Sequence, residues 1–279
     1  MTSIRNYAAY GYGLLAYIVA MATVAYTVGF LANVLVPKSI DAGVGLPVGD
    51  PIVVNLALIG LFGLQHSLMA RQWFKNRWTR LVPEPIERST YVLFASITLV
   101  VLMWAWKPLP DTVWMVEGPL AMILWGVYLG GWLLMFASSE MIDGADLMGL
   151  RQVRAYRDGR DVEPLDFQTP YAYRFVRNPM MVGFLVAFWA TSWMSVGHLL
   201  FAGGMTAYIL VGVKLEERDL ISTFGERYRQ YRRVVPLFVP RPWRTASRTS
   251  TDGPVPNERS RSTDPTSTTD TKGDNTTAK

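Results

Sequence analysis

Long apolar blocks alternate with short charged segments over the first 240 residues of this 279-residue chain. A helix that rises 1.5 Å per residue needs roughly 20 apolar residues to cross a bilayer core of about 30 Å. A soluble domain of this size would instead interleave apolar and charged residues along amphipathic helices and strands. The pattern therefore predicts membrane-spanning helices. The first four blocks of suitable length are residues 8–36, 52–70, 90–106 and 119–138.

The fifth apolar block, residues 180–215, is too long for a single span and is interrupted by Met194, Ser195, Val196 and Gly197. We expect a hairpin of two helices here, each of about 15–18 residues, that crosses or nearly crosses the membrane. The predicted fold class is all-α: a polytopic membrane helix bundle with about six membrane helices and a C-terminal helical hairpin.

Lysine and arginine are distributed unevenly among the segments between the blocks. Five lie in residues 71–88 and six in residues 141–178, whereas residues 37–50 and 107–117 contain one each. Loops rich in these residues usually face the cytoplasm. We therefore expect a multi-pass protein of a bacterial-type inner membrane, with both termini and the active site on the cytoplasmic side.

Three regions follow from the same pattern. Residues 1–140 form a four-helix membrane region, and residues 141–240 combine a cytoplasmic segment with the helical hairpin. Residues 241–279 are rich in Thr, Ser, Pro and charged residues and contain almost nothing apolar. Such a composition cannot bury enough surface to offset the entropy of ordering, so we expect this tail to be disordered.

Composition excludes several kinds of site. The chain has no cysteine, which excludes disulfides, thiolate zinc sites and a cysteine nucleophile. Glu140, Asp143 and Asp146 form an acidic group without a second set of ligands nearby, so we expect no metal. Glycine-rich nucleotide-binding motifs are absent. The expected partners are a small-molecule substrate and membrane lipid, with no nucleic acid.

His66 is an ionisable residue about one turn before the end of its apolar block. Ionisable groups inside membrane segments usually face the bundle interior and often mark function. A neutral imidazole could take the proton of a thiol, whose thiolate is the nucleophile. The alternative is a structural histidine bonded to a carbonyl or a loop acid. His198, in the turn of the hairpin, is expected to be structural.

Polar residues mark both ends of the hairpin. Asn178 suits the N-cap of its first helix and Pro179 suits the first turn. A helix start also favours an anionic ligand group, although the two residues can serve only to start the helix. Glu216 and Glu217 lie where the apolar run ends, near the same membrane face. They either bind a cationic ligand or pair with neighbouring basic residues such as Lys214.

Residues 173–240 resemble the C-terminal module of isoprenylcysteine carboxyl methyltransferases. The shared features are Tyr173, Arg177-Asn178-Pro179, Gly183, the Glu216-Glu217 pair and the segment from Phe224-Gly225-Glu226 to Pro236. The resemblance implies S-adenosylmethionine as cofactor, bound at the cytoplasmic face. It implies a cofactor site made of Gln152, Tyr173, Arg177, Asn178, Pro179, Met180, Met181, Glu216 and Glu217. Asn178 replaces a histidine of that family, and Gly212 replaces the arginine that holds a prenylcysteine carboxylate, which disfavours a prenylated protein substrate.

A longer pattern, covering most of residues 8–240, resembles the bacterial methanethiol S-methyltransferases. It comprises Leu-Gln-His-Ser-Leu-Met-Ala-Arg around His66, the following basic loop, Gly-Leu-Arg-Gln-Val around Arg151, and the hairpin. That family implies transfer of a methyl group from S-adenosylmethionine to methanethiol, giving dimethyl sulfide, with His66 and Arg151 as candidate catalytic residues. The alternatives are a related methyltransferase acting on an isoprenoid, a lipid or a larger thiol, and a non-catalytic membrane accessory protein.

Overall fold

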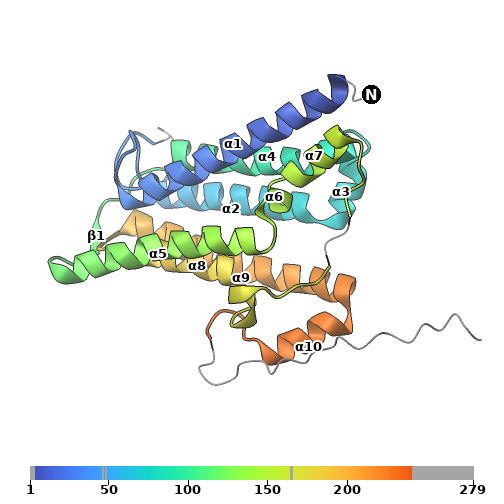
Figure 1. Cartoon of the computed structure of the whole chain (residues 1–279). Coiled ribbons are helices and arrows are strands. Elements are labelled where there is room, and N and C mark those ends of the chain that lie inside the picture. Colours follow the sequence, from blue (N-terminus) through green and yellow to red (C-terminus); the bar gives the residue numbers. More distant parts are fainter. Residues whose placement is uncertain (1–3, 46, 48, 164–165, 241–279) are drawn as a thin grey trace, which may run out of the picture. The chain divides into compact units, whose positions relative to one another are not determined.

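The computed structural model describes residues 4–45, 47, 49–163 and 166–240, and the predicted disordered tail lies outside them. The fold is helical, with one two-stranded antiparallel sheet, β1–β2, as its small β component. The elements, drawn in Figure 1, are α1 (Ile4–Ala32), α2 (Pro51–Ala70), α3 (Gln72–Trp78), α4 (Glu84–Ala105), β1 (Thr112–Met115), α5 (Pro119–Met141), α6 (Gly144–Leu147), α7 (Leu150–Asp158), η1 (Tyr171–Arg174), α8 (Pro179–Trp189), β2 (Trp193–Ser195), α9 (Val196–Phe224) and α10 (Glu226–Val234).

Within the described residues, five helices, α1, α2, α4, α5 and α9, are long and apolar enough to cross a membrane. This confirms the predicted membrane helix bundle and a multi-pass integral membrane protein. Capping residues and prolines mark the starts of several of these helices. The Asp50 carboxylate accepts hydrogen bonds from the backbone N–H groups of Ile52 and Val53 at the start of α2, and a proline occupies the first turn of α2, α4, α5 and α8.

The C-terminal hairpin is confirmed, but its two helices differ more in length than expected. The first, α8, has 11 residues, or about 16 Å at 1.5 Å per residue, which is too short to cross a bilayer core by itself. The second, α9, has 29 residues and continues past the apolar run to Phe224. The chain leaves α8 in extended form and pairs β2 with β1, so that Trp193 lies opposite Met115. This pairing satisfies backbone groups that a longer α8 would have bonded internally.

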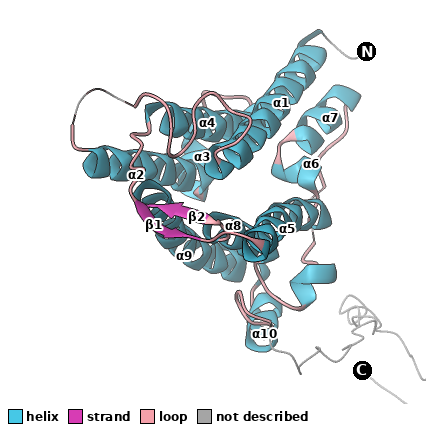
Figure 2. Cartoon of the chain, turned by 90° about the vertical axis from the view of Figure 1, so that its left-hand side faces the viewer, coloured by secondary structure: helices cyan, strands magenta, loops and turns pink. Residues whose placement is uncertain are grey.

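The membrane helices pack in two groups that meet along α2 and α9. One group contains α1, α2 and α4, with the short α7 against α1 and α4; the other contains α5, α8 and α9 (Figures 1 and 2). The α5 and α8 backbones approach closely because Gly131 and Gly183 face each other. A hydrogen bond of 2.6 Å from the Tyr128 hydroxyl of α5 to the Val28 carbonyl of α1 also joins the groups.

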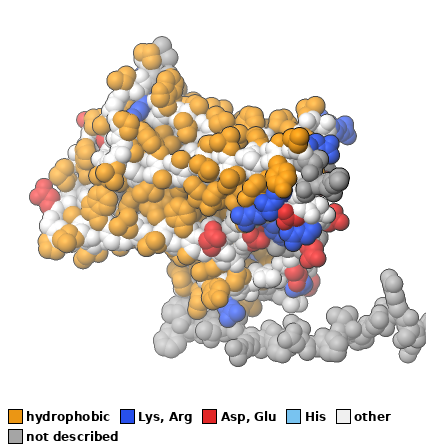
Figure 3. All heavy atoms as spheres, turned by 45° about the horizontal axis from the view of Figure 1, so that its top comes forward, with side chains coloured by type: hydrophobic (Ala, Val, Ile, Leu, Met, Phe, Trp, Pro, Cys, Tyr) orange, Lys and Arg blue, Asp and Glu red, His pale blue; other side chains and the backbone are white. Residues whose placement is uncertain are grey.

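The outer surface of the bundle is apolar, as a lipid-facing surface must be. Figure 3 shows hydrophobic side chains covering the viewed face along the helices, with charged side chains gathered towards one end. On α5, for example, Met122 and Leu133 are 76% and 69% exposed. An exposed apolar face that runs along the helices would be unusual on a soluble monomer.

Candidate active site

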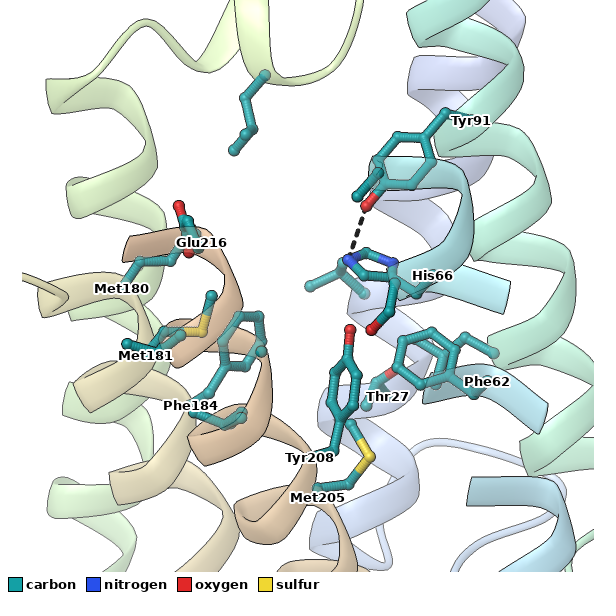
Figure 4. A pocket seen from close by; sticks show the side chains of 18 of the residues that line it. Thr27, Phe62, His66, Tyr91, Met180, Met181, Phe184, Met205, Tyr208 and Glu216 are labelled. Carbon is teal, nitrogen blue, oxygen red and sulfur yellow. Dashed lines mark hydrogen bonds between the residues drawn. The ribbon is translucent and has the colours of Figure 1, made fainter. Parts of the chain in front are cut away.

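A cavity of about 420 Å³ lies between the two groups of helices. Its walls come from α1, α2 and α4 on one side and from α5, α8 and α9 on the other, and Figure 4 shows it from close by. A volume of this order suits a small-molecule ligand. The residues that carry its chemistry are Phe62, His66, Arg71, Arg88, Tyr91, Trp132, Met180, Met181, Phe184, Phe188, Phe201, Met205, Tyr208, Gly212, Glu216 and Asp219.

The inner part of the cavity is aromatic and apolar. Trp132 of α5 packs edge-to-face on Phe184 and Phe188 of α8, with ring centroids 5.9 and 6.5 Å apart. Phe188 packs in the same way on Phe201 of α9, at 5.4 Å. Edge-to-face packing fixes these rings in place. The result is a rigid, apolar chamber that disfavours water.

The other end of the cavity carries charges of both signs. Arg71, just after α2, forms a 2.9 Å ion pair with Asp219 of α9. Glu216, one turn earlier on α9, lines the cavity, and its carboxylate forms no hydrogen bond or ion pair with any residue the structure describes. Arg71 and Arg88 attract this carboxylate electrostatically. Two carboxylates and two guanidinium groups therefore face the same space.

His66 and Tyr91 form a hydrogen-bonded pair on the α2–α4 side of the cavity. The His66 Nε2 atom lies 2.8 Å from the Tyr91 hydroxyl (Figure 4). The other imidazole nitrogen, Nδ1, is buried and has no hydrogen-bond partner among the described residues. The Tyr208 ring stands edge-on to the imidazole, 6.2 Å away between centroids. Both residues line the cavity, and their hydrogen bond joins the imidazole to the Tyr91 hydroxyl.

The residues predicted at the cofactor fall into three places. Met180, Met181 and Glu216 line the cavity, as does the candidate base His66. Asn178 and Pro179, directly before Met180, do not line the cavity. Asn178 occupies the N-cap position of α8, as expected, but its side chain accepts no capping hydrogen bond. Its Nδ2 atom is buried without a partner among the described residues. A buried, unpaired amide donor is rare in a folded protein and is a common sign of a missing ligand or water.

A second group, Tyr173, Arg177 and Glu217, lies outside the cavity lining. Arg177 Nε donates to the Glu217 carboxylate at 2.7 Å, and both side chains are nearly buried. Arg177 also donates to the Arg232 carbonyl at 3.0 Å, and the Tyr231 hydroxyl donates to the Tyr173 carbonyl. Burial raises the pKa of the Tyr173 and Tyr231 phenols, so both stay neutral hydrogen-bonding groups. These bonds fasten α10 to the start of α8.

The third group contains Arg151 and Gln152 of α7. Both side chains bond the Asp146 carboxylate, at 3.2 and 2.9 Å, and neither residue lines the cavity. The Gln152 Oε1 atom is buried with no partner among the residues described. Leu147, next to Asp146, lines the cavity, and its carbonyl accepts a 3.0 Å hydrogen bond from Arg88. The α6–α7 segment is thus attached at the charged end of the cavity.

Comparison with known proteins gives the family. The chain is 49% identical over 242 residues to methanethiol S-methyltransferase 1 of Bradyrhizobium diazoefficiens, covering 86% of this chain and 84% of that protein. It is 46% identical over 241 residues to the methanethiol S-methyltransferase of Mycobacterium tuberculosis, covering 86% of this chain and 99% of that protein. This chain belongs to the methanethiol S-methyltransferase family. No family model and no solved structure matches it.

Membership of this family makes the protein an integral membrane methyltransferase, and it confirms the family predicted from the sequence. A methyltransferase needs a methyl donor and an acceptor. The sequence did not indicate Arg71, Arg88, Tyr91, Tyr208 and Asp219 as site residues. The available signal was weak: Arg88 and Tyr91 lie three residues apart at the start of α4, which places them on one helix face.

Proposed function

We propose that this protein transfers a methyl group from S-adenosylmethionine to methanethiol and so forms dimethyl sulfide. The observation that carries the proposal is a single cavity with charges of both signs at one end and an apolar aromatic chamber at the other. A charged methyl donor and a small apolar thiol are the pair of ligands that these two ends suit. The names of the family's relatives support the same reaction.

The charged end fits the polar groups of S-adenosylmethionine. Its amino-acid part carries an ammonium and a carboxylate, and its sulfur is a cation. Glu216 and Asp219 would hold the positive groups, while Arg71 and Arg88 would hold the carboxylate. The unpaired buried amide of Asn178 would reach polar atoms of the same ligand. Met180, Met181, Pro179 and Gln152 remain predicted cofactor residues; for Tyr173, Arg177 and Glu217 we propose a supporting role through the hydrogen bonds described above.

The protein would promote the reaction by excluding water and by removing one proton. When bound, the sulfonium supplies an electrophilic methyl group and leaves as a neutral thioether. The aromatic chamber leaves the thiol sulfur poorly solvated and therefore more reactive. Nδ1 of His66 is buried and Nε2 is hydrogen-bonded to the Tyr91 hydroxyl. The thiol proton would therefore pass to the Tyr91 oxygen, while Tyr91 gives its own proton to His66 Nε2. Arg151, predicted as catalytic, would act by holding Asp146 and α7 in place.

We further propose that the charged end of the cavity faces the cytoplasm. The two arginine-rich segments, 71–88 and 141–178, both contribute residues at this end, and such segments usually remain cytoplasmic. A charged donor would then enter from water, and an apolar thiol could reach the chamber through the lipid.

The test uses purified protein in detergent or liposomes, with methyl-labelled S-adenosylmethionine and methanethiol. We expect labelled dimethyl sulfide in the headspace. We also expect Glu216→Gln to weaken S-adenosylhomocysteine binding at least about tenfold by calorimetry, since a charge-assisted contact is lost. Glu226→Gln, at an exposed position on α10, is the matched control. Absence of S-adenosylhomocysteine binding to the wild type would favour the accessory-protein alternative, and binding without dimethyl sulfide formation would point to another acceptor.

A further inference from the structure

Gly212 occupies an unusual place in the cavity wall. Tyr208, Gly212 and Glu216 follow one another at four-residue spacing on α9, so they share a helix face. All three line the cavity. Gly212 therefore separates the phenol of the inner part from the carboxylate of the charged end, and it contributes no side chain between them.

Helix packing does not account for this glycine. Packing explains the glycines at positions 63 and 204. A Cβ atom on Gly63 would lie 2.9 Å from the Tyr208 ring, and a Cβ atom on Gly204 would lie 2.8 Å from the Ile59 side chain. A Cβ atom on Gly212 would meet no other heavy atom within 4 Å. Glycine also weakens a helix interior compared with alanine. What Gly212 provides is open space in the cavity, at the junction of its charged and apolar ends.

That junction is where a methyl group would pass from a donor held at the charged end to an acceptor held in the chamber. The chamber behind it is lined by Phe62, Phe184 and Met205 on three helices (Figure 4). A methanethiol molecule has two non-hydrogen atoms, but the cavity of about 420 Å³ must hold the donor as well. The open space around the Cβ position of Gly212 is therefore where a longer alkyl group of an acceptor would fit. A charged acceptor would be disfavoured by the apolar walls.

We propose that Gly212 is a specificity-determining residue that keeps open the space for the alkyl group of the acceptor, and that the acceptors are short, neutral alkanethiols in general. This inference rests on the proposed function, because it concerns the second substrate of the same site. On this proposal, the range of thiols that the protein accepts depends on one position on α9. Larger side chains at this position should exclude progressively shorter alkyl groups.

The experiment compares Gly212→Ala and Gly212→Leu with Gly203→Ala and Gly203→Leu. Gly203 is a matched control because it lies on the same helix, has open space around its Cβ position and does not line the cavity. Values of kcat/KM are measured for methanethiol, ethanethiol and 1-propanethiol by the release of S-adenosylhomocysteine. S-adenosylhomocysteine affinity is measured separately by calorimetry on each purified protein.

We expect the wild type and both Gly203 variants to methylate all three thiols. Gly212→Leu should lower the ratio of kcat/KM for 1-propanethiol to that for methanethiol by about tenfold or more, and Gly212→Ala should lower it less. Affinity for S-adenosylhomocysteine should change less than about threefold, since the acceptor space is not the cofactor's.

Four results would overturn the assignment. An unchanged thiol ratio in both Gly212 variants would remove the position from acceptor selection. A large loss of S-adenosylhomocysteine affinity in Gly212→Ala would give the space to the cofactor instead. A wild type that methylates methanethiol but neither longer thiol would refute the wider acceptor class. A wild type that binds S-adenosylhomocysteine and methylates no thiol would overturn the proposed function itself, and this inference with it.

Discussion

The close approach of α5 and α8 makes Gly183→Ala a sharp test of how this bundle is held together. A Cβ atom at Gly183 would lie 2.6 Å from the Gly131 carbonyl oxygen and 2.6 Å from the Met135 backbone nitrogen. The reverse contact is equally tight, since a Cβ atom on Gly131 would lie 2.7 Å from the Ala187 nitrogen. These neighbours are backbone atoms, which cannot rotate out of the way. One added methyl group must therefore push α8 away from α5.

The size of the effect follows from two opposing contributions. Alanine stabilises a helix interior by about 0.5–1 kcal/mol relative to glycine. Overpacking a well-packed interior costs about 1–3 kcal/mol, and backbone contacts belong at the upper end of that range. The net loss in the free energy of unfolding is then about 1–2 kcal/mol. At about 2–4 °C per kcal/mol for a chain of this size, the Tm should fall by about 2–8 °C.

The assay is thermal unfolding of the purified protein in one detergent, together with turnover. Gly203→Ala is the control, because its added methyl group meets open space and brings only the gain in helix propensity. Turnover should fall in Gly183→Ala as well, since a displaced α8 moves Met180 and Met181, which line the cavity. A Gly183→Ala protein with a Tm equal to or above that of Gly203→Ala would refute the reasoning.

Three further outcomes follow from the site. Arg177→Met should lower the free energy of unfolding by about 3 kcal/mol, because the nearly buried Glu217 carboxylate loses its cationic partner and keeps only the 3.3 Å hydrogen bond from the Tyr228 hydroxyl. Denaturation curves of Arg177→Met and of the double variant with Glu217→Leu check this, and the double variant should recover part of the loss. Tyr91→Phe should lower kcat with methanethiol by about a hundredfold while calorimetry shows unchanged S-adenosylhomocysteine affinity; full turnover would exclude the proton route through Tyr91. Arg71→Ala should raise the KM for S-adenosylmethionine about tenfold through the loss of a charge-assisted contact, whereas a change in the thiol KM alone would place Arg71 at the acceptor instead.

Much of the fold follows from apolar block length, because a bilayer requires a nearly fixed helix length. The four early spans and the hairpin lie close to where the blocks predict them. The length of the apolar blocks did not predict where α4 begins or where α8 ends. Helix α4 begins at Glu84, ahead of its apolar block, because its first turn is polar and helical. Helix α8 ends at Trp189, earlier than its apolar block suggests, because the following residues pair with β1.

Residues of the candidate site could be predicted from the sequence where an ionisable residue stands in or next to an apolar segment. His66 and Glu216 are ionisable residues at the ends of apolar runs, and this local conflict is visible without any structure. Arg71 and Arg88 look like ordinary loop charges, since nothing in their neighbourhood conflicts with a solvated role. Tyr91 looks like one aromatic residue among many. Their place in the cavity lining depends on contacts across helices.

Those contacts arise from the way the two groups of helices are joined. The glycines of α5 and α8 draw that pair tightly together, whereas the two groups meet mainly along α2 and α9. Space is therefore left between the groups, bounded by α2 and α9 on either side of it. Arg71 closes this space by its ion pair with Asp219, 148 residues further along the chain. Periodicity reports only on neighbours within a few turns, so an ion pair at this separation leaves no trace in the local pattern, and the charged end of the cavity could be identified only from the folded chain.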